Sequence, residues 1–400
     1  TQSRSSAASD VYKRQLLTAY LLDLSAKFTR IPTVIWLLAI GWGLQQFTNY
    51  AHIHVPDLSE VLPVFGTIGL ILIVLEGALD LKLSTRAIPL ISRALIMSVL
   101  PFIAFSGLFA WALVQYEHCS WRLAILNAVP FAIISSAIAI PSVKNFSSSV
   151  RAFITYESSI SDIIGVLVFN FILVNKFVNA TALFGFFGQI IIVLIFSIIL
   201  TILLSFMLSR LSHHVKFGPI LLLILLLFGL SKLWHLPGLL FILIFGLALS
   251  NLHLFREWKI ASIFQPEKIP HEIKQFSDIV AEATFLIRSL FFVVFGFMIQ
   301  TKDILDIQVL PWSLGLMGLL IILRFIFLLL IGQKNRPYLF VAPRGLITIL
   351  LFLSIPMNMR IPIVNNALII QVILMSIALM MLGLLFYSEP KKRNTEDEQV

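Results

Sequence analysis

The sequence predicts an all-α polytopic membrane protein with about thirteen transmembrane helices, built as inverted repeats in which two broken helices cross. Of its 400 residues, 59% are hydrophobic and 12% are charged, whereas soluble domains carry about 25% charged residues. A soluble chain with a mean hydropathy of +0.97 cannot bury that much apolar surface. The apolar runs are also continuous rather than alternating, which excludes a membrane β-barrel.

Twelve apolar runs are interpreted as spans of a bilayer core of about 30 Å. They lie at 31–49, 61–79, 90–115, 122–143, 153–175, 184–210, 217–235, 237–252, 280–300, 309–332, 338–356 and 362–387. The run at 237–252 is short, so cover by a neighbouring helix is required to accommodate the mismatch. The segment 253–279 between two runs is interpreted as a helix on the membrane surface.

The first residues do not fit a complete span. Residues 1–15 are polar and Ser-rich, and the apolar stretch at 16–26 is too short to cross the bilayer. Either residues 1–15 are a non-native fusion scar that truncated a first helix, which gives thirteen spans, or they are a native polar tail before a half-helix. At the other end, 388–400 is expected to be a short cytoplasmic tail, with no nucleotide-binding domain.

Basic residues are distributed unequally between alternate loops, with 18 Lys and Arg on one side and 5 on the other. The positive-inside rule therefore predicts a cytoplasmic C-terminus in the plasma (inner) membrane. The same distribution accounts for the net charge of +9 without a nucleic-acid partner. A single cysteine, Cys119, excludes a disulfide framework and thiolate metal centres.

Of the ionisable residues inside predicted spans, where each costs roughly 2.5–3.5 kcal/mol, six are singled out as candidates for function or pairing. They are Glu76, Glu157, Asp162, Arg288, Arg324 and Arg344. All eight histidines lie in loops or at span ends, and the sequence has neither a Gly-rich phosphate loop nor paired cysteines. These features disfavour an ATP-driven pump and a membrane-embedded enzyme, and they predict no cofactor. A transporter or channel driven by ion gradients remains.

The segment YESSISDIIGVLVFN, residues 156–170, carries two of these acids. Glu157 shares a helical face with Ser161, and Asp162 shares another with Ser158. The two carboxylates are about 140° apart around the axis. Both acids can be structural partners of buried arginines; we favour this for Glu157, with Arg324 as partner. For Asp162 we favour a group that accepts either a proton or a small cation, because burial disfavours a bare charge.

Two spans are predicted to break near mid-membrane. NAVPFAIISSAIAIPSV, residues 127–143, places prolines on both sides of Ser135 and Ser136, and VAPRGLITILLFLSIP, residues 341–356, repeats the pattern. Proline removes a backbone donor and opens carbonyls. Interrupted helices at corresponding positions are typical of inverted-repeat transporters. The alternative is two unrelated proline-kinked helices.

Four segments together resemble the monovalent cation:proton antiporters of the sodium/hydrogen exchanger family. ESSISDIIGVLVF resembles the family's E-S-x-x-N-D-x-x-x-x-V helix, and VLEGALDLKL resembles the end of its third helix. FLIRSLFFVVFGFMI is similar to the tenth helix, and APRGLITILL to the segment opening the broken twelfth helix. Their order and spacing agree from Leu16 to Tyr387.

This resemblance implies a homodimeric antiporter, spanning 16–387, that exchanges Na⁺ or K⁺ for H⁺ by alternating access. It implies a dimerisation part at about 16–79 and 217–300, a core part at about 90–175 and 309–387, and a linker helix at about 184–210. Asp162 falls on the cation- and proton-binding aspartate, and Glu157 on the acid that pairs with Arg324. Arg344 falls on a structural or gating arginine. The role of Arg288 stays open.

Two departures from the family pattern leave the transported cation open. Ser161 stands where Asn or Asp is common, and Ser135-Ser136-Ala137 stands where many members have Thr-Asp-Pro. Hydroxyls still coordinate hard cations, so the expected site is Asp162 with four serines: Ser135, Ser136, Ser158 and Ser161. One variable acid predicts electroneutral one-for-one exchange, unless Glu157 also titrates. The alternatives are a sodium-coupled organic-anion symporter, a lipid-modifying enzyme and a sensor.

Overall fold

The computed structural model describes eleven stretches of the chain: residues 33–53, 61–81, 88–143, 146–175, 184–186, 188–197, 199, 217–233, 238–251, 269–333 and 336–385. Three of the features predicted above lie wholly outside them: the tail 1–15, the truncated first helix and the tail 388–400. The linker helix 184–210 and the segment 253–279 lie partly outside them.

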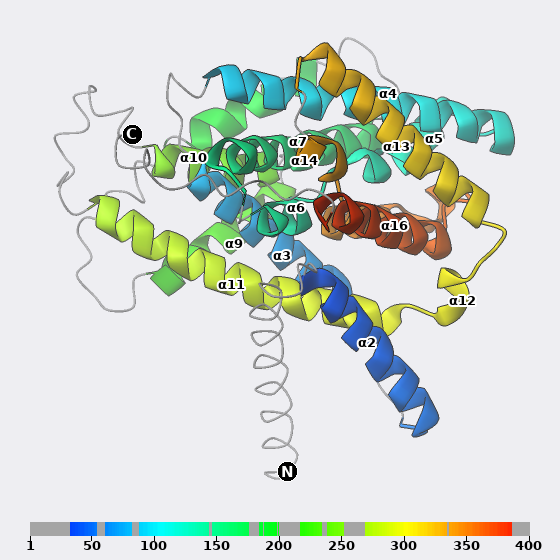
Figure 1. The fold of residues 1–400 in the computed structure, drawn as a ribbon. Helices are drawn as coiled ribbons and strands as arrows, with labels where there is room; N and C mark the ends of the chain where they lie inside the picture. The colour runs from blue at the N-terminus through cyan, green and yellow to red at the C-terminus, as the bar shows by residue number, and fades with distance from the viewer. Residues whose placement is uncertain are drawn as a thin grey trace.

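The regular elements of the described residues are all helices (Figure 1). The first eight are α2 (Thr33–Tyr50), α3 (Val61–Asp80), α4 (Ile88–Glu117), α5 (Trp121–Ala132), α6 (Ser136–Ser142), α7 (Ser148–Val174), α9 (Phe217–Leu233) and α10 (Gly238–Ser250). They are followed by α11 (Ile269–Met298), α12 (Thr301–Ile304), α13 (Leu310–Leu330), α14 (Arg336–Phe340), α15 (Leu346–Ser354), the 3₁₀ turn η4 (Met357–Met359) and α16 (Asn366–Leu385).

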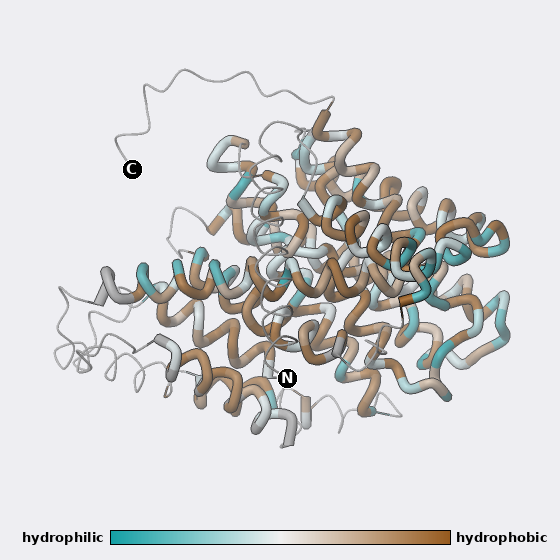
Figure 2. The backbone as a smooth tube through the Cα atoms, turned by 90° about the horizontal axis from the view of Figure 1, so that it is seen from below, coloured by the Kyte–Doolittle hydropathy of each residue, from teal (hydrophilic) through white to brown (hydrophobic). Residues whose placement is uncertain are grey.

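Six helical segments of the described chain are long and apolar enough to cross a membrane. They are α4, α5 together with α6, α7, most of α11, α13 and α16. Figure 2 shows that hydrophobic residues predominate along most of the backbone drawn in colour. The protein is therefore an all-helical membrane protein, as predicted, while the total of thirteen spans stays a prediction.

The helices pack into two groups (Figure 1). In the first, which we call the α11 group, α2 and α3 pack on α11, while α10 packs on α3 and α9. In the second, the α7 group, α4, α5 and α6 pack around α7, and α13, α14, α15 and α16 complete it. The groups meet where α3 and α10 lie against α7, and where α3 contacts α6 and α15.

Two helical passages are interrupted. The first breaks between α5 and α6, where Ile133 and Ser135 have extended backbone. The second breaks between α14 and α15, across residues 341–345. Both breaks fall within the segments that the sequence marked, but Pro130 and Pro141 stay inside helices, and the chain opens between them. The interrupted stretch leaves backbone N–H and C=O groups available that would be hydrogen-bonded to one another in a continuous helix.

The helix that carries the predicted span at 280–300 begins well before that span. Helix α11 begins at Ile269, so part of the segment interpreted as a surface helix belongs to it. Pro270 is compatible with the first turn of a helix, because the N–H groups there have no intrahelical acceptor. The polar residues that follow kept this portion out of the apolar run without interrupting the helix.

Candidate functional site

Asp162 lies deep in the α7 group, with 2% of its surface exposed. Its Oδ2 accepts a hydrogen bond from the Ser136 hydroxyl at the start of α6. Its Oδ1 has no hydrogen-bond partner among the described residues. A buried carboxylate oxygen without a partner is costly, so this position favours a bound cation or proton.

The two interruptions meet beside this carboxylate. The backbone N–H of Ser135 donates to the carbonyl of Pro343 at 2.8 Å, which joins the first break to the second. Gly345 permits the approach, because a Cβ there would lie 2.9 Å from Ser135 Oγ and 2.6 Å from Ile138 Cδ1. The crossing is therefore fixed by main-chain atoms and by the absence of a side chain.

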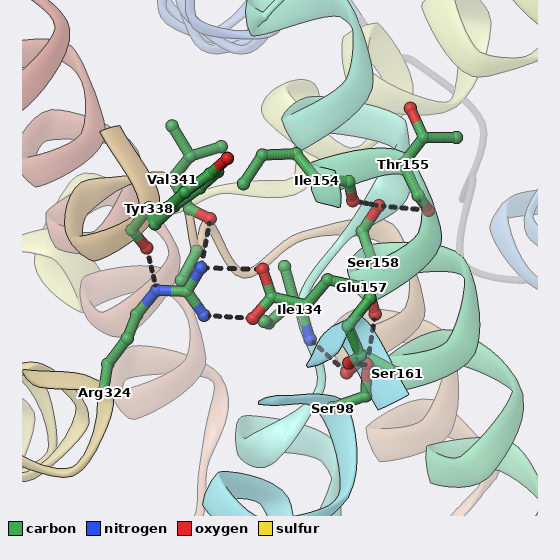
Figure 3. A network of polar contacts seen from close by, with 12 residues as sticks. Ser98, Ile134, Ile154, Thr155, Glu157, Ser158, Ser161, Arg324, Tyr338 and Val341 are labelled. Carbon is green, nitrogen blue, oxygen red and sulfur yellow. Dashed lines mark hydrogen bonds and ion pairs between the residues drawn. The ribbon is translucent and has the colours of Figure 1, made fainter. Parts of the chain in front are cut away.

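Ser161 and Ser158, the two other serines predicted for the site, differ in their contacts. Ser161 Oγ accepts the N–H of Ile134 at 3.0 Å, so it ties α7 to the first break. Ser158 Oγ donates to the carbonyl of Ile154 at 2.7 Å, on its own helix (Figure 3). In this conformation the Ser158 hydroxyl is therefore engaged with the backbone of α7.

Four buried hydroxyls have no hydrogen-bond partner among the described residues: those of Ser106, Ser135, Ser159 and Thr348. Of these, Ser135 was predicted for the site, whereas the other three were not. Ser159 lies one helical turn before Asp162, where a Cβ on Gly77 of α3 would come within 3.1 Å of its Oγ. The i, i+3 spacing to Asp162 was the available signal for Ser159. Thr348 had none, since its position depends on the second break.

Glu157 is in a different environment from Asp162, although both acids belong to α7. Arg324 of α13 donates from Nη1 and Nη2 to the two oxygens of Glu157, at 2.6 and 2.8 Å (Figure 3). The same guanidinium donates to the carbonyls of Tyr338, at 2.5 Å, and Val341, at 3.2 Å. This bidentate pair is buried and well satisfied.

Arg344 is 2% exposed and belongs to the second break. Its Nε donates to the carbonyl of Phe131 at 2.6 Å, and its Nη1 to that of Ala342 at 3.2 Å. Phe131 lies in the last turn of α5, where the helix dipole favours a positive charge. The backbone N–H of Arg344 donates to Ser376 Oγ of α16 at 2.9 Å. Arg344 thus joins the end of one half-helix to the other break.

The two remaining predicted charges belong to the α11 group. Glu76 is half-buried on α3, directly before Gly77. Arg288 of α11 is also half-buried, and its Nη1 donates to the carbonyl of Ala137 on α6 at 3.4 Å.

A cavity of about 30 Å³ lies among α4, α13, α14 and α16. One water molecule needs roughly 10–15 Å³, so the cavity has room for water. Its polar lining includes Ser161, Arg324, Arg344 and Ser376. Ser161 therefore has the break on one side and a hydratable space on the other.

Comparisons with known proteins agree with this architecture. The family model described as "Sodium/hydrogen exchanger, transmembrane" matches residues 16–387. A structure of the sodium proton antiporter MjNhaP1 from Methanocaldococcus jannaschii at pH 8 is similar, with a TM-score of 0.71 and 21% identity over 94% of this chain and 98% of that one. An electron-microscopy structure of the same antiporter gives a TM-score of 0.70 and 19% identity over 96% and 99%. No curated protein matches by sequence.

Proposed function

The chain belongs to the sodium/hydrogen exchanger family, and from this premise we propose that it exchanges Na⁺ or K⁺ for H⁺ at Asp162. Membership makes it a multi-pass membrane transporter rather than an enzyme. The observation that carries the proposal is the unpartnered Oδ1 of the buried Asp162 carboxylate. A cation and a proton compete for this oxygen, and either one neutralises the charge. The empty, ionised form is held back by the cost of moving a bare charge past an apolar barrier.

The proposed cation ligands are oxygen atoms around the crossing of the two breaks. Asp162 supplies the charge, and Ser135, Ser136 and Ser161 border it, which suits a hard monovalent cation. Ser159 adds a further hydroxyl without a described partner. Ser158 joins this set only if its hydroxyl leaves the carbonyl of Ile154.

The same proposal assigns roles to the two helix groups. The α11 group forms the dimerisation part of a homodimer, and the α7 group is the core that moves against it. Their packing supports this division, since each group packs internally and the two meet along α3 and α10. The C-terminus lies in the cytoplasm, on the side richer in Lys and Arg.

We propose one-for-one, electroneutral exchange. Two hydrogen bonds from Arg324 favour the ionised form of Glu157, so in this proposal Asp162 alone changes its occupancy during the cycle. One cation moving against one proton through a single carboxylate transfers no net charge.

The test uses reconstituted vesicles with an internal pH dye and an imposed proton gradient. Addition of Na⁺ or K⁺ in turn is expected to collapse the gradient for one of them, and Asp162→Asn is expected to abolish this. Asp306→Asn, which alters an aspartate in the loop before α13, is the matched control and should behave like the parent. Exchange that survives in Asp162→Asn would refute the assignment, and a rate that depends on membrane potential would refute electroneutrality.

A further inference from the structure

Arg288 connects the two helix groups next to the candidate site. It lies on α11, and its Nη1 donates to the carbonyl of Ala137 on α6. This carbonyl is the hydrogen-bond acceptor that the guanidinium contacts among the described residues. Ala137 directly follows Ser136, whose hydroxyl donates to Asp162. The contact therefore links the α11 group to Ala137, the residue next to Ser136, which is itself hydrogen-bonded to Asp162.

The carbonyl of Ala137 is available because of Pro141. In a continuous helix this carbonyl would accept the N–H of the residue four positions later. That residue is Pro141, inside α6, and proline has no N–H to donate. Arg288 supplies the missing donor from another helix group. A buried carbonyl left without a donor would carry a free-energy cost, so the contact has a physical reason to form.

We propose that Arg288 is a positioning residue that latches α6 to α11, through the carbonyl freed by Pro141, in the conformation seen here. The inference rests on the alternating-access function proposed above. Movement of the α7 group against the α11 group separates Arg288 from Ala137, so the latch stabilises this conformation over the opposite-facing one. The donor is a charged guanidinium, and at 3.4 Å the contact is long, so it can be released when the two groups move.

Loss of the latch should change the cation KM differently on the two sides of the membrane. An apparent dissociation constant rises as the binding-competent fraction falls. Without the latch, the populations of the two facing conformations change in opposite directions, so the cation KM should rise on one side of the membrane and fall on the other. The ratio of the two KM values is expected to change roughly tenfold. A role confined to stability would not shift the two constants in opposite directions.

The experiment measures cation KM from both sides of oriented vesicles. Arg288→Met should change the KM ratio, and Arg288→Lys should restore most of it, because an ammonium group can also donate to the carbonyl. Pro141→Ala returns a helical donor to Ala137 and should move the ratio in the same direction as Arg288→Met. The double variant should add little to either single one. Pro101→Ala in α4 is the control proline, and its effect should be additive with Arg288→Met.

An unchanged KM ratio in Arg288→Met, with exchange intact, would overturn the latch and leave the proposed function standing. If the parent exchanges no cation, the proposed function fails, and the contact is judged by thermal unfolding of the purified protein. There, Arg288→Met and Pro141→Ala should be non-additive. Additive unfolding shifts would overturn the inference by that route.

Discussion

Neutralising Glu157 should lower the thermal stability of the protein, whereas neutralising Asp162 should not. In Glu157→Gln, the Arg324 guanidinium stays buried and loses the carboxylate that accepts two of its hydrogen bonds. Removing one partner from a buried ion pair costs about 3–5 kcal/mol, because the other charge is left uncompensated. Glu157 and Arg324 are only 1% and 5% exposed, so solvent cannot replace the lost partner. We expect the unfolding temperature to fall by several degrees.

Asp162→Asn is the matched comparison on the same helix. Asp162 is as deeply buried as Glu157, but the described residues offer it a hydroxyl partner, Ser136, rather than an ion pair. Neutralising Asp162 leaves no buried basic side chain without its partner, and it removes a buried charge. The free energy of unfolding should therefore be unchanged or higher. The assay is thermal unfolding of both purified variants and the parent in one detergent.

A double-mutant cycle then isolates the ion pair. Arg324→Met should destabilise more than Glu157→Gln, since it also strips the carbonyls of Tyr338 and Val341 of a donor. The Glu157→Gln/Arg324→Met double variant should lose less stability than the sum of the single losses. Equal effects of Glu157→Gln and Asp162→Asn, or additive losses in the cycle, would refute the assignment of Glu157 as a structural partner.

Three further outcomes are expected. Ser136→Ala removes the hydroxyl that donates to Asp162 and should raise the cation KM several-fold, or on the order of 1 kcal/mol; an unchanged KM in vesicle assays would contradict the contact. Gly345→Ala places a Cβ against the first break and should abolish exchange, whereas Gly318→Ala in α13, with open space around it, should not; equal activity would count against the crossing. Burial raises the pKa of the Cys119 thiol, so maleimide should label it more slowly at pH 7 than a free thiol, and labelling at the free-thiol rate would contradict this.

The breaks were predictable from the sequence to within a few residues, because proline and glycine act locally on the backbone. Pro130 and Pro141 marked a helix that could not continue with all its hydrogen bonds. They did not mark the opening itself, which lies between them at Ile133–Ser135. Its position depends on the carbonyl of Pro343, more than two hundred residues away. Proline and glycine indicate which segment is interrupted, whereas tertiary contacts determine at which residues the helix opens.

The candidate site was less predictable than the fold for the same reason. Helical spacing placed Ser158 on the face of Asp162, but its hydroxyl donates to the backbone of its own helix, an alternative open to any serine in a helix. The early start of α11 was missed because hydropathy reports where lipid begins and not where a helix begins.

The hydrogen bond between the two breaks joins an amide of one to a carbonyl of the other, and both groups belong to the main chain. Any residue other than proline can supply the amide at position 135, and every residue, proline included, supplies the carbonyl at position 343. The main-chain geometry of the crossing can therefore be retained during evolution while the side chains around Asp162 change. Ion preference and architecture become separable traits, so a few hydroxyl or carboxyl replacements offer a short evolutionary route from one transported cation to another.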